Sequence, residues 1–514
     1  MVNSTETLFK DAQACEKQGD WSGAVALYQA ALAESPDFVE AQHNLALALR
    51  QLGQSDEALK WAQSAAALRP DHPTIQFSLG LSLEQTGQIR LAIEAYRNSA
   101  ALRPNYVAAL NNLGRLLEVA GDIPDSIKIL DRALAQAPSD LGVQLNLANS
   151  YLQGGQPEKS IELLQALISQ DNQIAAAHNS LGVAAHVTGD QRQAILHFRE
   201  AIKLDPQFAE AHENLAQALL FEAEYEEAWA EYEWRWQNDS NTQSKRHLSE
   251  PVWHGESLAG RTLLVHAEQG FGDVIQFVRF LSSIEKSDGR LILACHAALV
   301  ELFSDLDAVD QVVDMKDAIP QFDCHAPLLS LPRILGVDGT SIPNTPYIAP
   351  KLSGSGLAAS KLKVGFAWAG MPRHEFDPHR NRSCPVEVFD SLTKLTEFEF
   401  YSLQTGPQAA ELGKIGGSNT IIDLEPRIHN FNDTAKLVSE LDLVISVDTA
   451  LAHLAGAQGK KVWILLATCA DWRWQHKVTN NPWYPTARLF RQKSPGNWAY
   501  LLDDVIEEIR TLIP

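Results

Sequence analysis

The chain has 514 residues, 45% of them hydrophobic and 21% charged, which is enough for several compact units and typical of folded proteins. Acidic residues (64) outnumber Lys and Arg (42), and the resulting formal charge of -22 disfavours nucleic acid or an anionic membrane as a general partner. A phosphate ligand would need a small local cationic pocket built from a few side chains or helix termini.

The cysteines and the chain start predict the compartment. The five cysteines are widely spaced and include no Cys-x-x-Cys pair, which favours a reducing environment over a disulfide framework or a zinc site. Met1–Thr7 has no basic or apolar segment of a secretory signal, and apolar runs such as Val462–Ala467 are only as long as a strand. We therefore expect a cytoplasmic protein without a transmembrane segment.

Residues of the first half recur every 34 positions. The recurring glycines are Gly19, Gly53, Gly87, Gly121, Gly155 and Gly189. Five positions later come Ala24, Ala58, Ala92, Ser126, Ser160 and Ala194, and four beyond these a larger apolar residue is common, as at Tyr28, Tyr96, Leu130, Leu164 and Phe198. The recurring prolines are Pro36, Pro70, Pro104, Pro138 and Pro206, with Asn172 in the one open slot.

This punctuation predicts pairs of helices. Each glycine suits the turn between two helices, each small residue lets them approach closely, and each proline ends the second helix. The pattern resembles the tetratricopeptide (TPR) repeat over residues 5–240, with about seven repeats in an α-solenoid. The last repeat, Ala209–Tyr232, has Ala223 at the glycine position.

One position on the first helix of the repeat is rich in amides. It holds Asn44, Asn112, Asn146 and Asn214, with Ser78 and Ser180 between them. This row is similar to the asparagine ladder of O-GlcNAc transferases, which grips peptide backbone, and amides suit that task because they donate and accept. The alternative interpretation is a row of solvent-facing or inter-repeat polar side chains.

The register ends in the polar segment 237–246, and a different pattern follows. Short apolar runs alternate with helical stretches at 262–266, 291–294, 311–313, 364–368, 398–403, 443–447 and 462–466. Such alternation predicts parallel sheets covered by helices, and a Pro-, Ser- and Gly-rich segment at 339–362 divides the region into two lobes. We expect a repeat array over 1–240, an amino-terminal Rossmann-like lobe over 250–345 and a carboxy-terminal lobe over 360–514.

The first candidate site is the turn after 262–266. Gly270 and Gly272 permit a tight turn, and Asp273 opens a helix. A dinucleotide fingerprint would need glycine where Ile275 stands, so that motif fails. Asp273 is either a helix cap or a functional carboxylate.

The second candidate site follows the apolar run 443–447. Asp448 and Thr449 open a helix of small residues that includes Ala450, and His453 lies one turn further on. Free amide groups and the positive end of the helix dipole favour a phosphate there, to which Thr449 adds a hydroxyl.

The third candidate site follows the run 364–368. A Trp368-Ala369-Gly370 turn leads into a loop with His374, Asp377, His379, Arg380, Asn381, Arg382 and Ser383. Guanidinium groups bind diphosphate with two parallel hydrogen bonds, which gives this loop a possible role in an acidic chain. A solvated loop is the alternative.

Together these motifs resemble the heptosyltransferase-like glycosyltransferases (family 9) of GT-B fold, and above all a bacterial branch with fused TPR repeats, over about residues 250–510. The motifs Asp471–Trp474, Pro482–Pro485 and Arg488–Gln492 resemble signatures of that branch. Heptosyltransferases have glycine where this chain has Ala450, which leaves the donor open.

The resemblance implies an inverting, metal-independent sugar transfer from a nucleotide-sugar donor to an acceptor hydroxyl, with no cofactor. Asp273 would be the general base. The donor would be bound by Gly272, Arg382, Ser383, Asp448, Thr449, Ala450 and His453. The TPR array would hold a polypeptide acceptor or partner.

Two other classes of function stay open: a TPR scaffold whose transferase-like half is inactive, and a nucleotide-sugar epimerase of GT-B fold. For Trp472, Trp474, Trp483 and Tyr484 we expect packing rather than sugar stacking. The length of the last helix, Val505–Leu512, suits a return to the amino-terminal lobe, as in other GT-B folds.

Overall fold

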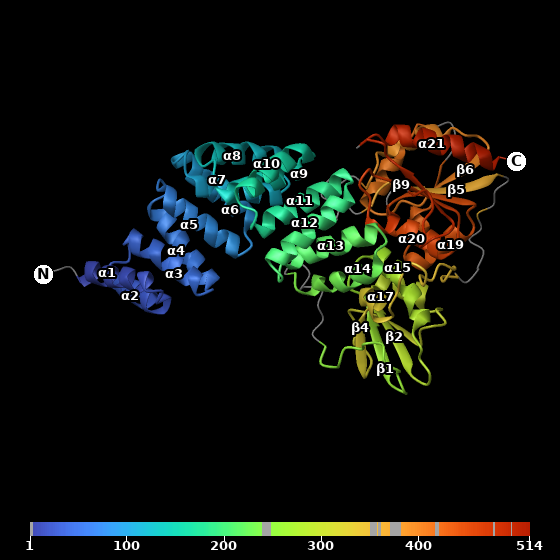
Figure 1. Ribbon diagram of the computed structural model, residues 1–514, viewed down its shortest axis with the longest axis horizontal. Helices are drawn as coiled ribbons and strands as arrows, with labels where there is room; N and C mark the ends of the chain where they lie inside the picture. The colour runs from blue at the N-terminus through green and yellow to red at the C-terminus, as the bar shows by residue number, and fades with distance from the viewer. Residues whose placement is uncertain are drawn as a thin grey trace. The chain divides into compact units, whose positions relative to one another are not determined.

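A computed structural model describes residues 4–238, 248–349, 357, 361–370, 382–416, 421–475, 478–494 and 496–513. The chain divides into two compact units, Met1–Ala184 and Ala185–Pro514. The first consists of helices alone, and the second contains the last helices of the array together with the α/β lobes (Figure 1).

The array is built from paired helices. In the first unit these are α1 (Ser4–Lys17), α2 (Trp21–Glu34), α3 (Val39–Gln51), α4 (Ser55–Leu68), α5 (Pro73–Gln85), α6 (Ile89–Leu102), α7 (Val107–Val119), α8 (Ile123–Gln136), α9 (Leu141–Gln153) and α10 (Pro157–Gln170). Then come α11 (Ala175–Thr188), α12 (Gln191–Leu204), α13 (Ala209–Phe221), α14 (Tyr225–Tyr232) and the 3-10 helix η1 (Glu233–Trp236). The array is thus the predicted α-solenoid.

The recurring residues take the predicted places in each helix pair. All six recurring glycines have φ between 68° and 87°, and Ala223 adopts the same left-handed conformation at 63°. The six small residues five positions later are fully buried. A side chain at Gly80 would come within 2.5 Å of the Tyr96 ring, so the helices of this pair approach more closely than a side chain at this position would allow.

A further contact of the array was not predicted from the sequence. The side chain six residues after the punctuating proline bonds to that proline's carbonyl: Gln42 to Pro36 (2.6 Å), Gln76 to Pro70 (3.1 Å), Gln144 to Pro138 (2.5 Å) and His212 to Pro206 (3.3 Å). These bonds satisfy a carbonyl left without a partner where one helix pair gives way to the next.

The α/β region contains two all-parallel sheets. The first has the order β3-β2-β1-β4, with β1 (Thr262–His266), β2 (Arg290–Cys295), β3 (Gln311–Asp314) and β4 (Cys324–Pro327). The second has the order β10-β9-β8-β5-β6-β7, with β5 (Leu362–Ala367), β6 (Phe398–Ser402), β7 (Ile422–Asp423), β8 (Leu443–Val447), β9 (Val462–Leu466) and β10 (Ala487–Arg491). Both predicted lobes are therefore present.

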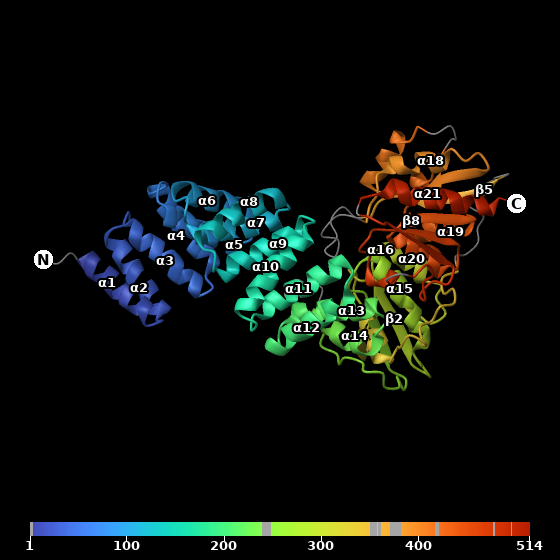
Figure 2. The same cartoon turned by 45° about the horizontal axis from the view of Figure 1, so that its top comes forward.

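Helices lie between successive strands, and one more follows the last strand. The connecting helices are α15 (Phe271–Phe277), α16 (Ala297–Phe303), α17 (Leu331–Ile334), α18 (Asp390–Thr393), α19 (Phe431–Ser439) and α20 (Ala450–Ala457), with 3-10 turns that include η3 (Val278–Ser283) and η8 (Trp472–Trp474), and α21 (Trp498–Ile509) follows β10. Figure 2 shows α19, α20 and α21 around the second sheet.

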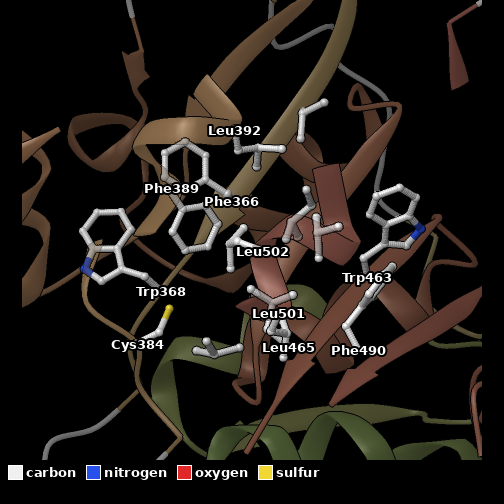
Figure 3. Packing of buried hydrophobic residues seen from close by; sticks show 14 of the residues in the cluster. Phe366, Trp368, Cys384, Phe389, Leu392, Trp463, Leu465, Phe490, Leu501 and Leu502 are labelled. Atoms are coloured by element: carbon white, nitrogen blue, oxygen red, sulfur yellow. The ribbon is translucent and has the colours of Figure 1, made fainter. Parts of the chain in front are cut away.

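The last helix does not return to the amino-terminal lobe, contrary to the sequence-based expectation. Leu501 and Leu502 of α21 lie in one buried cluster with strand residues of the second sheet, including Phe366 and Leu465 (Figure 3). The buried apolar residues of α21 thus pack on the lobe that the helix follows in the chain.

The end of the array shares its core with both lobes. The Trp229 ring of α14 contacts Phe277 of α15 and Trp472 of η8, with centroids 6.1 Å and 5.9 Å apart. Arg235, 2% exposed, donates to both carboxylate oxygens of Glu268 (3.0 and 3.2 Å) directly after β1. The last helical turn of the array, η1, ends at Trp236, but the compact unit begins at Ala185 because these contacts join the last repeats to the lobes.

Candidate functional site

The carboxyl edge of the second sheet brings two of the predicted motifs together. The strand order reverses between β5 and β8, and open α/β sheets bind ligands at such a switch point. A side chain at Gly370, after β5, would lie 3.6 Å from the Thr449 methyl group, after β8. Gly370 N–H donates to the Ser383 hydroxyl (3.1 Å), so Ser383 joins the same edge.

The start of α20 is open toward this edge. The Thr449 hydroxyl pairs with Ser446 (2.9 Å) and makes no hydrogen bond to the amides of α20. The first turn of α20 therefore lacks a side-chain cap, and its N–H groups and dipole suit an anionic ligand.

Asp448 is a buried carboxyl beside Arg382. The two side chains are 3.7 Å apart, and Asp448 is 6% exposed. Burial raises the pKa of Asp448 to about 6, with a further rise from Asp471, and the neighbouring Arg382 only partly offsets this. The buried Asp448 carboxyl therefore binds a proton more readily than an exposed aspartate.

His453 is held as a neutral ring. Its Nδ1 pairs with the Tyr484 hydroxyl (3.0 Å), and the ring stacks on Trp474 with centroids 5.0 Å apart. Burial lowers the pKa of His453 to about 3, and Arg473 adds to that effect. His453 can therefore donate or accept a hydrogen bond at this site, but it does not supply a positive charge.

The first candidate motif lies against this site from the other lobe. A side chain at Gly272 would come within 2.9 Å of the His453 ring and 3.8 Å of the Ala450 Cα atom, so α15 packs closely on α20 (Figures 1 and 2). Gly272 is needed for this approach, which explains a glycine inside a helix.

Asp273 follows Gly272 on α15, with both carboxylate oxygens engaged. Oδ2 accepts from the Gly270 N–H (3.1 Å), and Oδ1 accepts from Arg473 Nη2 (2.6 Å). Its side chain is 18% exposed, so water still reaches it. Both interpretations of Asp273 are thus compatible with the geometry: it caps the helix and it presents a carboxylate at the junction of the lobes.

Arg473 and Asp471 were not among the predicted site residues. Arg473 Nη1 donates to both oxygens of Asp471 (2.9 and 3.1 Å), and Nε donates to Gln276 Oε1 (2.6 Å). The guanidinium lies 4.3 Å above the Trp472 ring. The motif Asp471–Trp474 predicts packing from its two tryptophans, whereas its Asp and Arg have no local pattern that marks a contact with Asp273.

The predicted cationic pocket is, in the described part of the chain, a network of paired charges. Arg382 lies beside Asp448, and Arg473 pairs with Asp273 and Asp471. Residues 371–381, with the predicted loop residues His374, Asp377, His379, Arg380 and Asn381, lie outside the described ranges. The turn that leads into them is fixed by Gln404, whose side chain accepts from the Trp368 and Ala369 amides (3.1 and 2.9 Å).

The aromatic residues of the tail are packed, as expected. Trp472, Trp474, Trp483 and Tyr484 are all 5% exposed or less. Within the described ranges, no group of three or more His, Cys, Asp or Glu side chains has an arrangement that would hold a metal ion. No helix in the same ranges has both the length and the hydropathy to cross a membrane.

The predicted asparagine row is half-buried and engaged with neighbouring helices. Asn44 donates to the Tyr28 hydroxyl (3.2 Å), Asn112 to the Tyr96 hydroxyl (3.4 Å) and Asn146 to Asn111 Oδ1 (2.9 Å). Asn214 is half-buried as well. The amides thus have an inter-helix role, and a side-chain amide has further donor and acceptor capacity beyond one such bond.

Comparison with known families agrees with this architecture. Residues 17–79, 77–140, 120–181 and 186–220 match models of the tetratricopeptide repeat, and residues 403–493 match glycosyltransferase family 9 (heptosyltransferase). The chain therefore has TPR repeats and, over residues 403–493, a segment of the glycosyltransferase family 9 type, in agreement with the resemblance seen in the sequence. The family 9 match includes Asp448, His453 and Arg473.

Individual relatives cover parts of the chain. It is similar to Protein FlbA of Caulobacter vibrioides, with 25% identity over 319 residues, and the match spans 55% of this chain but only about half (52%) of FlbA. Among solved structures it is similar to a tetratricopeptide repeat protein from Parabacteroides merdae (18% identity, TM-score 0.43, 47% of this chain and 95% of that one). It is also similar to the C-terminal part of a TPR repeat-containing protein from Cytophaga hutchinsonii (17% identity, TM-score 0.36, 45% of this chain and 95% of that one).

Proposed function

We propose that the protein transfers a sugar from a nucleotide-sugar donor to an acceptor hydroxyl with inversion of configuration. One observation supports this proposal: the uncapped start of α20, the Trp368–Gly370 turn and Arg382 meet at the switch point of the second sheet, whose later strands lie in the family 9 match, and Gly272 of α15 packs on His453 from the other lobe. A nucleotide held at such a switch point would present its sugar toward α15.

In this reaction Asp273 takes the acceptor proton while the acceptor oxygen bonds to the anomeric carbon, whose bond to the diphosphate oxygen breaks. The departing nucleoside diphosphate gains negative charge, which Arg382 and the amides of α20 would stabilise without a metal ion. Gly272, Ser383 and Ala450 shape the backbone around the donor. Asp448 and the neutral His453 would bind sugar hydroxyls.

The array would bring a polypeptide to the enzyme. The asparagine row (Asn44, Asn112, Asn146 and Asn214) offers amides that match peptide groups without reading side chains. The five cysteines, all free thiols, support a cytoplasmic location.

Two substitutions test the proposal, with release of nucleoside diphosphate from UDP-, GDP- and ADP-sugars as the measurement. Asp273→Asn should reduce turnover about 10²- to 10⁴-fold and leave nucleoside diphosphate binding intact. Arg382→Ala should weaken that binding by roughly 10- to 100-fold, since a charge-assisted hydrogen bond contributes about 1.5–3 kcal/mol.

Arg488→Ala is the matched control, because Arg488 on β10 pairs with Glu508 of α21. It should change neither quantity. Full turnover by Asp273→Asn would refute the general-base role. A panel of sugar nucleotides screened by thermal shift identifies the donor, since a ligand at 100 times its Kd adds about 2.7 kcal/mol to stability.

A second candidate function is a TPR scaffold with an inactive transferase-like domain. The pairing of Arg382 and Arg473 with aspartates favours it, because a charge already neutralised within the protein attracts a diphosphate less strongly. A scaffold of this kind would bind no nucleoside diphosphate and turn over no sugar nucleotide.

A further inference from the structure

The Arg473 side chain contacts both the Asp273 carboxylate and the Asp471 carboxylate at the start of η8. It comes from η8 of the carboxy-terminal lobe, while Asp273 and Gln276 belong to α15 of the amino-terminal lobe. It is 7% exposed, so its charge lies in a largely dry environment.

Each of the three guanidinium nitrogens of Arg473 donates to its own partner. Nη2 donates to Asp273, Nη1 to Asp471 and Nε to Gln276, at distances between 2.6 and 3.1 Å. Trp472 stacks on the guanidinium plane, and the Arg473 carbonyl accepts from Asn481 (2.6 Å). The guanidinium group of Arg473 is therefore fixed by a hydrogen bond at each nitrogen, and Nη2 holds Asp273 Oδ1 in one position.

Stability alone does not account for this arrangement. A buried ion pair loses hydration on both partners, so a well-packed apolar pair is often as stable or more stable. The arrangement instead fixes an orientation. The Asp273 carboxylate accepts from the Gly270 amide at one oxygen and from Arg473 at the other, and these two bonds hold it in one orientation.

We propose that Arg473 is the positioning residue of the general base: it holds the Asp273 carboxylate toward the donor side of the site and couples that carboxylate to the carboxy-terminal lobe. This inference rests on the proposed function, in which Asp273 is the base. Arg473 acts through Asp273 and need not touch the donor.

The test is Arg473→Lys, which keeps the positive charge but replaces three directed donors by one ammonium group. With the sugar nucleotide that the panel identifies, kcat should fall about 10- to 100-fold, the size expected for a displaced catalytic group, while the affinity for nucleoside diphosphate stays within about threefold. In the Asp273→Asn background the same change should have no further effect on kcat.

Arg279→Lys is the matched control. Arg279 is also buried between the lobes (1% exposed), but it donates to the carbonyls of Pro343 and Trp483 and to the Tyr347 hydroxyl rather than to a carboxylate. It should lower Tm and leave kcat within about twofold, because loss of a buried hydrogen bond acts on stability.

Three results would overturn the inference. The kcat of Arg473→Lys could equal that of the wild type, or Arg279→Lys could lower kcat as much as Arg473→Lys does. The third is a double variant of Arg473→Lys and Asp273→Asn whose loss of kcat equals the product of the two single losses. If Arg473→Lys does not fold, Gln276→Leu takes its place, since Gln276 fixes Nε of Arg473; an unchanged kcat there overturns the inference as well. Full turnover by Asp273→Asn would instead refute the proposed function, so the two failures are distinguishable.

Discussion

Asp448 sits at the end of β8 with almost no access to water, between a guanidinium that favours its charge and a second carboxyl that opposes it. Burial of the charged form of Asp448 costs folding free energy that a neutral asparagine of similar shape avoids. A position that keeps the costly residue is a candidate for function.

The contribution of Asp448 to the free energy of unfolding depends on pH. Its pKa is 3.8 in an unfolded chain and, because of burial, about 6 in the folded one, so between these values the folded chain binds more protons at this side chain. The contribution of Asp448 to stability therefore falls as pH rises from about 4 to about 6 and stays low above.

Asp448→Asn should thus gain Tm relative to the wild type when pH is raised from about 4.5 to about 7.5, measured by differential scanning fluorimetry. Asp503→Asn on α21 controls for the loss of one negative charge, because Asp503 is exposed. An equal Tm difference between Asp448→Asn and the wild type at both pH values would contradict a buried carboxyl at this site.

At the scale of elements, the contact of α15 with α20 depends on the absence of a side chain at Gly272. Gly272→Ala places a Cβ 2.9 Å from the His453 ring, which is held by Tyr484 and Trp474 and cannot move aside freely. We expect a loss of about 1–3 kcal/mol in the free energy of unfolding, as for other overpacked sites, together with lower turnover.

Gly413→Ala is the control for Gly272→Ala, because a Cβ there meets no atom within 4 Å. Its free energy of unfolding by urea should stay close to that of the wild type. Equal effects of the two substitutions would show that close approach at Gly272 is not what the glycine provides.

Elements with a strong apolar signal were predictable from the sequence, and others were not. The runs 262–266, 443–447 and 462–466 coincide with β1, β8 and β9, because buried parallel strands are continuous apolar segments. Strand β4, Cys324–Pro327, contains a histidine and a proline, and β7 has only two residues, so neither gave such a signal.

The same limit applies to the candidate site. Motifs directly after strands predicted the meeting of Asp448, Thr449 and Arg382, since the carboxyl ends of parallel strands share an edge. The pairing of Arg473 with Asp273 joins residues 200 positions apart, and no local pattern marks such a partner.

At the scale of the whole molecule, the compact unit that contains the two α/β lobes begins before the repeats end, at Ala185. A chain that begins at Leu248 would lose the aromatic partners of Phe277, Trp472 and Trp483, and it would lose the ion pair of Glu268 with Arg235. Large apolar side chains that are buried in the full chain would then be exposed to water.

We therefore expect residues 185–514 to be monodisperse in gel filtration and to unfold cooperatively, and residues 248–514 to aggregate or to melt at a much lower temperature in calorimetry. Equal Tm values for the two fragments would contradict a shared core.

The packing of the seventh repeat, α13 and α14, also limits which repeats evolution can add or remove. Because Trp229 and Arg235 belong to the packing of the lobes, this repeat is committed to its place, while whole 34-residue repeats upstream of Ala185 can be gained or lost by recombination without altering those contacts. The number of upstream repeats is thus free to vary while the packing of the last repeat on the lobes is kept.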